Sequence, residues 1–243
     1  MFLSKKQIVF LFAAAIVLFI SAVSFFSRGS SPELFGEPTV GIGGAGQELV
    51  FPVRERDSDL EIRNSFQAYL QSDIPDGSWT FFGDSTDSVT PGQFLRAVGG
   101  DIDNSLEALL DPQELQLYTC TANNQSVSER HAVLSVRFAL QENYQGDFFR
   151  DQLLALTSWE QSLVSDIQPV LFPNQILLVS DSTSVEFTNM QDGGYTFFRT
   201  ATVSTNDGET VSIYYMMIGD EVLIGNSESC ILRAQQLLFD LSA

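Results

Sequence analysis

The chain has 243 residues, of which 44% are hydrophobic and 12% aromatic, enough apolar material for one folded domain together with a targeting segment. Its 31 acidic and 12 basic residues give a formal net charge of −19, which repels the phosphates of nucleic acids and the headgroups of anionic lipids. We therefore predict no nucleic-acid partner.

The first predicted element is a membrane-spanning helix over residues 8–26, a run that contains no charged side chain. At about 1.5 Å rise per residue, the run matches a hydrocarbon core about 30 Å thick. Lys5 and Lys6 precede it, so the positive-inside rule keeps residues 1–6 in the cytoplasm and sends the rest of the chain outward. The sequence thus predicts a single-pass plasma-membrane anchor over residues 7–27, which contacts the lipid bilayer through residues 8–26 and carries an extracytoplasmic C-terminal domain.

A cleaved secretory signal is the competing interpretation of this segment. Ala22-Val23-Ser24 provides a small-x-small cleavage site after a shorter apolar core. The apolar run continues through Phe25 and Phe26, which favours an uncleaved anchor. Both interpretations place the folded domain outside the cytoplasm.

The cysteines of the chain are Cys120 and Cys230, an even number in a compartment where disulfides persist. A bridge between them would restrict the unfolded chain and add roughly 3 to 5 kcal/mol of stability. The alternative is a pair of unrelated buried thiols, since cysteine behaves as a small hydrophobic residue. The sequence leaves both possibilities open.

Residues 28–48 are rich in glycine, serine and proline, which is typical of a flexible linker. They include Gly41, Gly43 and Gly46, which match the spacing G-x-G-x-x-G of dinucleotide-binding loops. Such a loop needs a strand before it and a helix that opens at the last glycine, because the pyrophosphate rests on the helix N-terminus. The extended, proline-containing stretch after Gly46 predicts no helix there, so we interpret the motif as linker and expect no cofactor.

The folded domain is expected over residues 49–243, with helices first and then alternating strands and helices. The first two helices are predicted from N-terminal capping signals and the strands from alternating apolar residues. In chain order, the predicted elements are a helix over 58–72, a strand over 79–82, a helix that begins at Pro91, a short helix over 105–110, a hairpin with strands near 115–119 and 131–140, a long helix over 149–167 that ends before Pro169, strands over 176–179, 195–204, 209–218 and 221–224, and a terminal helix capped by Ser227.

Strands joined by tight turns imply antiparallel pairing, so the predicted fold class is α+β, with one or more antiparallel sheets packed by amphipathic helices. The order of strands followed by a helix occurs twice after residue 113. This order suggests a subdivision of the domain near residues 113 and 173.

No residue pattern in the sequence is typical of a catalytic or metal site. The stretch from Asp101 to Glu107 looks like a calcium loop, but Leu106 stands where the loop needs glycine, so these acids are expected at a helix N-terminus. His131 is the one histidine, and neither a G-x-S-x-G elbow nor a zinc-ligand set accompanies it. We expect no catalytic residue and no metal.

Two stretches, from Trp159 to Pro169 and from Gly219 to Ser229, resemble segments of uncharacterised single-pass bacterial envelope proteins. The resemblance implies a location and carries no activity. We therefore predict a non-enzymatic envelope protein that binds a partner or ligand or has a structural role, with another envelope protein as the expected partner. The alternatives are an extracytoplasmic hydrolase that uses carboxylates alone and a ligand-sensing module.

Overall fold

The computed structural model describes residues 39–41, 48–51, 53–84, 87–124, 127–139, 147–179, 185–190 and 197–242. The predicted membrane segment and cytoplasmic stub lie outside these residues, as do Gly43 and Gly46. Over the described ranges, none of the helices has the length and apolar character needed to cross a bilayer. Residues 38–243 form one compact unit, to which the following description applies.

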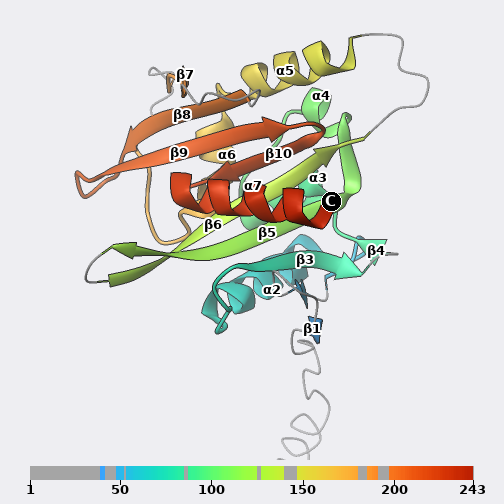
Figure 1. The fold of residues 1–243 in the computed structure, drawn as a ribbon. Coiled ribbons are helices and arrows are strands. Elements are labelled where there is room, and N and C mark those ends of the chain that lie inside the picture. Colours follow the sequence, from blue (N-terminus) through green and yellow to red (C-terminus); the bar gives the residue numbers. More distant parts are fainter. Residues whose placement is uncertain are drawn as a thin grey trace, which may run out of the picture. The chain divides into compact units, whose positions relative to one another are not determined.

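The strands form a sheet that runs the whole width of this unit (Figure 1). They are β1 (Thr39–Gly41), β2 (Glu48–Phe51), β3 (Ser78–Asp84), β4 (Asp87–Ser88), β5 (Leu110–Asn124), β6 (Val127–Phe138), β7 (Thr188–Asn189), β8 (Phe197–Ser204), β9 (Thr210–Ile218) and β10 (Glu221–Gly225). Their order is β1-β2-β3-β5-β6-β10-β9-β8-β7, and β4 attaches to β3. Neighbouring strands are antiparallel except β2 and β3, which are parallel.

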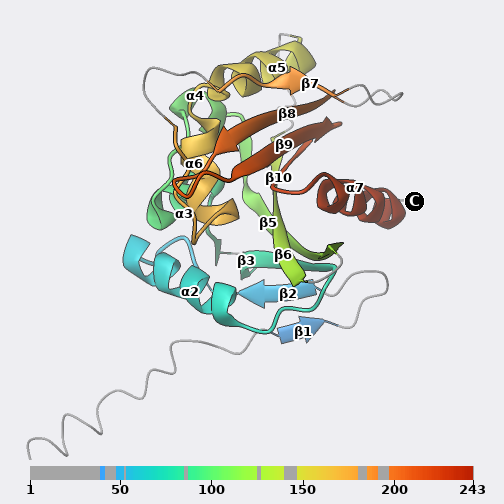
Figure 2. The same ribbon diagram turned by 90° about the vertical axis from the view of Figure 1, so that its left-hand side faces the viewer.

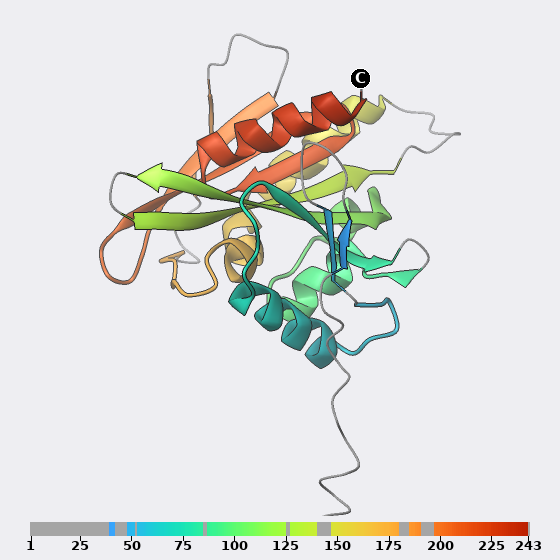
Figure 3. The same ribbon diagram turned by 60° about the horizontal axis from the view of Figure 1, so that its bottom comes forward.

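Helices cover both faces of the sheet, as Figure 2 shows. They are α2 (Asp59–Gln71), α3 (Pro91–Val98), α4 (Asn104–Glu107), α5 (Phe148–Trp159), α6 (Leu163–Leu171) and α7 (Glu228–Ser242). The group from α2 to α6 lies on one face, and α7 lies on the other with α2 far from it (Figure 3). An α+β fold is therefore confirmed.

The first two helices begin where their capping residues predict. The Ser58 hydroxyl accepts a hydrogen bond from the Glu61 amide, and the Glu61 carboxylate accepts one from the Ser58 amide, which completes a capping box at the start of α2. The Thr90 hydroxyl caps α3 by accepting from the Gln93 amide. Gly99 ends α3 in the left-handed conformation with φ of 102°, which glycine adopts without strain.

The predicted long helix over 149–167 is wrong: the structure divides it into α5 and α6. The chain turns after Trp159, and the Trp159 indole Nε1 donates to the Asp166 carboxylate at 2.8 Å across the break. Pro169 lies inside α6 and does not follow its end. Because α6 starts at Leu163, the missing amide of Pro169 removes one intrahelical bond, to the carbonyl four residues earlier, and the helix continues.

The predicted domain limits also differ from the structure. Thr39–Gly41 forms β1, which pairs with β2, so the folded unit reaches into the expected linker of residues 28–48. The subdivision near 113 and 173 is not found, because β5 runs through residue 113 and residues 38–243 are one unit. The expected strand over 176–179 is reduced to a single bridge between Leu177 and Thr205.

Each face of the sheet contributes to its own apolar core. The larger core lies beneath α2 to α6, and the smaller one lies beneath α7. Neighbouring residues on a strand point to opposite faces, so Phe82 enters the larger core and Phe81 packs against the smaller one. A disulfide joins Cys120 of β5 to Cys230 of α7, with the two Cα atoms 6.0 Å apart, and attaches α7 to the sheet.

Candidate functional site

A groove opens where the sheet splits beyond the end of β10. β10 pairs with β6 from Val133 to Arg137 and with β9 from Tyr214 to Ile218. The β5–β6 and β8–β9 hairpins extend past β10, as Figure 1 shows, and no described strand lies between them there. The groove has a volume of about 940 Å³ and is also lined by the ends of α2 and α6 and the start of α7.

Asn226 closes the inner end of the groove. Its amide N–H donates to the Ala132 carbonyl at 3.4 Å, and its side-chain oxygen accepts from the Ala132 amide at 3.1 Å. Its side-chain nitrogen donates to the Leu171 carbonyl at 2.9 Å. These three bonds tie the exit of β10 to β6 and to the end of α6, so the groove has a fixed floor.

One wall of the groove, formed by α2, β5 and β6, carries Tyr69, Thr119, Arg130 and His131. The Tyr69 hydroxyl is hydrogen-bonded to the Thr119 hydroxyl at 2.6 Å, and burial raises the pKa of Tyr69, which keeps it neutral. The Arg130 guanidinium donates to the Ser72 carbonyl at 3.2 Å and holds the β5–β6 hairpin against the end of α2. His131 is half-buried in this wall, and its Nδ1 has no hydrogen-bond partner among the described residues.

The opposite wall comes from the start of β9 and the first turn of α7. It presents Thr210 and Ser212 from β9 and the hydroxyls of Ser227 and Ser229, whose oxygens lie 3.1 Å apart. With the other wall, this gives many hydrogen-bonding groups, one cationic side chain and the carboxylate of Glu228. The groove is therefore suited to bind a polar or main-chain group.

Neither models of protein families, nor curated proteins, nor solved structures match this chain.

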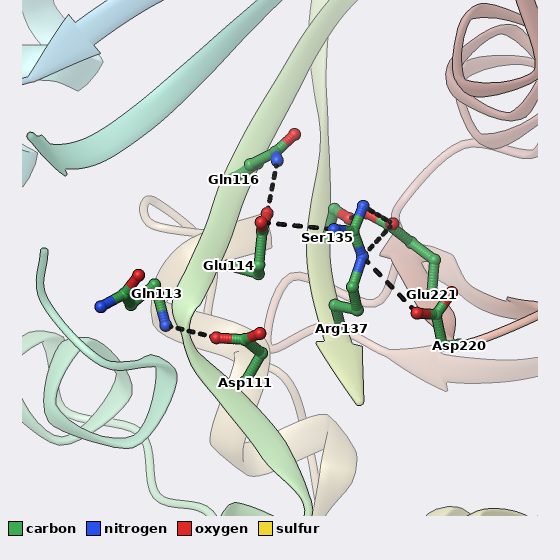
Figure 4. Close-up of polar contacts among 8 residues, drawn as sticks. All are labelled: Asp111, Gln113, Glu114, Gln116, Ser135, Arg137, Asp220 and Glu221. Atoms are coloured by element: carbon green, nitrogen blue, oxygen red, sulfur yellow. Dashed lines mark hydrogen bonds and ion pairs between the residues drawn. The ribbon is translucent and has the colours of Figure 1, made fainter. Parts of the chain in front are cut away.

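A second polar cluster surrounds Arg137 at the opposite end of β6 (Figure 4). The guanidinium lies 3.0 Å from the Glu221 carboxylate, 3.3 Å from that of Glu114 and 3.9 Å from that of Asp220. The hydroxyl of Ser135 also donates to Glu221. One cation thus joins the ends of β5, β6 and β10, and these carboxylates serve as its ion-pair partners.

The structure does not bring two buried carboxylates into one cleft within the described ranges. The buried acids there are Asp166 and Glu221. Asp166 belongs to α6, which covers the larger core, whereas Glu221 bonds to Ser135, which shares the α7 face with Val133. The sheet therefore separates them, and neither lines the groove.

The other candidate site residues of the sequence analysis cap helices or end strands. Asp103 caps α4 by accepting from the Ser105 amide at 2.8 Å, as expected for acids at a helix start. Gly41 ends β1, and the chain re-enters the sheet as β2 after the glycine motif, so no helix follows it. Across the residues that the structure describes, no group of histidine, cysteine or acidic side chains could hold a metal ion.

Asp166 predicts a specific pH dependence of stability. Burial raises its pKa above the ordinary 3.8 and outweighs the hydrogen bonds from Ser162 and Trp159, which lower it. The folded state therefore holds this proton more tightly than the unfolded state, and the free energy of unfolding decreases as pH rises from 3.8 through the raised pKa.

Replacing the Asp166 carboxyl with an amide tests whether its raised pKa makes stability depend on pH. The variant Asp166→Asn keeps an acceptor for the Trp159 indole and is expected to be more stable than the natural chain at pH 7. The difference should disappear below pH 3.8, where both side chains are neutral in both states. Urea denaturation at a series of pH values measures it. An equal difference at every pH would mean that packing, not ionisation, separates the two proteins.

Proposed function

We propose that the protein is a membrane-anchored component of the cell envelope whose extracytoplasmic domain binds another envelope protein in the groove between the β5–β6 and β8–β9 hairpins. The apolar run over residues 8–26 behind Lys5 and Lys6 supports the anchor and its orientation. The bridge between Cys120 and Cys230 supports an oxidising compartment.

The groove is the observation on which the binding function rests. Its floor is fixed by Asn226, one wall is held by Arg130, and α7 is attached to the sheet beside it by the disulfide. A binding site held by rigid elements loses little freedom when it engages a partner. The hydroxyls and main-chain groups of its walls offer hydrogen bonds to a partner.

The location can be tested by adding protease to cells whose layers outside the plasma membrane have been made permeable while the plasma membrane itself stays sealed. We expect the domain from residue 39 onward to be digested or released while a tag fused before Lys5 stays protected. Cleavage of the tag with the domain intact would reverse the orientation. Release of the entire domain without protease, with the chain shortened near Ala22, would instead identify a cleaved signal.

The partner can be tested by photo-crosslinking in living cells. A photoreactive phenylalanine analogue at Thr210 or Ser229, both in the groove, is expected to give one discrete adduct with another protein. The same analogue at Gln67, which is exposed on α2 and does not line the groove, serves as the matched control and should give none. Adducts from Gln67 alone would move the binding surface away from the groove.

A further inference from the structure

We propose that the groove binds its partner by strand addition: one extended segment of the partner continues the line of β10 and pairs with β6 and β9 at once. This inference rests on the proposed function and names the kind of ligand that the same site takes. It follows from the width of the groove, the main-chain groups that face it and the charge at its mouth.

The width follows from the pairing of the sheet. β6 and β9 are both neighbours of β10, so one strand separates them. Neighbouring strands are about 4.8 Å apart, so β6 and β9 are about 9.6 Å apart at the end of β10. This separation leaves room for one strand between them. β10 ends at Gly225, whereas β6 begins at Val127 and β9 at Thr210. The segment that fits between these edges is about four residues long, or about 13 Å.

The β6 edge turns unpaired main-chain groups to the groove. Ala132 directs both its N–H and its C=O to Asn226, on the side of β10. Main-chain groups alternate in direction along a strand, so those of Arg130, two residues earlier, point to the same side. Arg130 has no main-chain bond across the groove to any described residue.

The β9 edge does the same from the other side. Because β10 directs alternate residues to β6 and β9, Gly225 bonds to Tyr214 of β9, its partner in the ladder. Ser212 lies two residues before Tyr214, so its N–H and C=O also face the groove, while Val211 pairs with Val203 of β8. Two strand edges that face each other, and that have no main-chain partner there among the described residues, provide donors and acceptors for both sides of an added strand.

The excess of acidic side chains in and near the groove, where Arg130 is the one arginine or lysine of the lining, favours a cationic segment. Glu228 lines the groove, and Asp207 and Glu209 lie in the β8–β9 turn just before Thr210. The Thr205 hydroxyl lowers the pKa of Asp207, so this carboxylate is ionised at neutral pH. The chain as a whole carries a net charge of −19. The favoured ligand is an extended segment with alternating small or apolar residues and a lysine or arginine at its end.

One pair of variants distinguishes the strand edge from the side chain. Ser212→Pro removes the amide that faces the groove without removing a bond between β8 and β9, and proline is tolerated at such an edge position. Ser212→Ala removes the hydroxyl but keeps the amide, so it is the matched control. We expect both variants to fold, whereas Val211→Pro would lose a bond to β8 and destabilise the hairpin.

The test uses a displayed library of random heptapeptides selected against the full chain, and the selected peptides are then synthesised. We expect cationic peptides with alternating residues that bind the natural chain and Ser212→Ala equally and Ser212→Pro at least tenfold more weakly. Methylation of alternate peptide amides should weaken binding to the same extent, since it removes main-chain donors. Hydrogen exchange at the Arg130 and Ser212 amides should slow when the peptide binds.

The outcomes separate strand addition from the proposed function. If no peptide is selected, or if the peptides bind equally to the proline variant and when methylated, strand addition is refuted. A crosslinked adduct from Thr210 or Ser229 would in that case still support partner binding in the groove. Absence of both the peptides and the adduct would remove the groove as a binding site altogether.

Discussion

Removal of the disulfide between Cys120 and Cys230 is expected to lower the free energy of unfolding by about 5 kcal/mol. The two cysteines are 110 residues apart, so the bridge closes a long loop in the unfolded chain and removes much of its conformational entropy. The loss of stability should be greatest at α7, because this helix packs on its face of the sheet through Ile231 and Ala234 and is attached there by the bridge. We expect α7 to separate from the sheet before the larger core unfolds.

Guanidinium denaturation of the double variant Cys120→Ala with Cys230→Ala measures this effect. The natural chain with a reductant should show the same lowered midpoint, and the variant should not respond to reductant at all. Hydrogen exchange along α7 would show whether this helix opens first. A natural chain whose midpoint is the same with and without reductant would contradict a stabilising role for the bridge.

The elements with strong local signals are those that the sequence predicted well. The capping box of Ser58 and Glu61, the cap at Thr90 and the left-handed Gly99 act within a few residues, so α2 and α3 were predicted from neighbouring side chains alone. The strands near 197–204 and 210–218 were predicted from a short turn between alternating residues. These predictions did not depend on distant parts of the chain.

The features that the sequence does not predict correctly depend on contacts between distant segments. The parallel pairing of β2 with β3 requires α2 to cross between them, and a hairpin pattern cannot reveal it. The break between α5 and α6 is accompanied by the hydrogen bond from Trp159 to Asp166. The spacing of apolar residues along the sequence does not reveal this bond. Proline usually interrupts helices, so Pro169 predicts a helix end, yet α6 tolerates the loss of one hydrogen bond.

The groove could not be predicted for a related reason. It exists because β10 is shorter than the two strands that flank it, and those strands are neighbours of β10 only in the folded sheet. Asn226 and Ser212 carry no sequence signal that distinguishes them from ordinary turn and strand residues. His131 lies half-buried on β6, but its place in a groove wall depends on α2 and α6, which are distant in the sequence.

A glycine at the junction of α3 and α6 gives the second large expected effect. A Cβ atom on Gly100 would lie 1.9 Å from the main-chain oxygen of Asp166, so the backbone of α6 would have to move to admit it. We expect Gly100→Ala to lower the free energy of unfolding by about 3 kcal/mol, as overpacking against a rigid neighbour does. Urea denaturation followed by fluorescence measures this loss.

Gly92 provides the matched comparison, because a Cβ there would also lie 1.9 Å from its nearest neighbour, a carboxylate oxygen of Glu107. That neighbour is the end of a flexible side chain, which can rotate away at the cost of its partly exposed ion pair with Arg96. Such a pair contributes about 1 kcal/mol at most, and alanine regains about as much inside a helix. Gly92→Ala should therefore be nearly neutral. Equal losses for the two variants would show that α6 yields as readily as a side chain, and that the contact between Gly100 and Asp166 does not fix the position of this helix against the sheet.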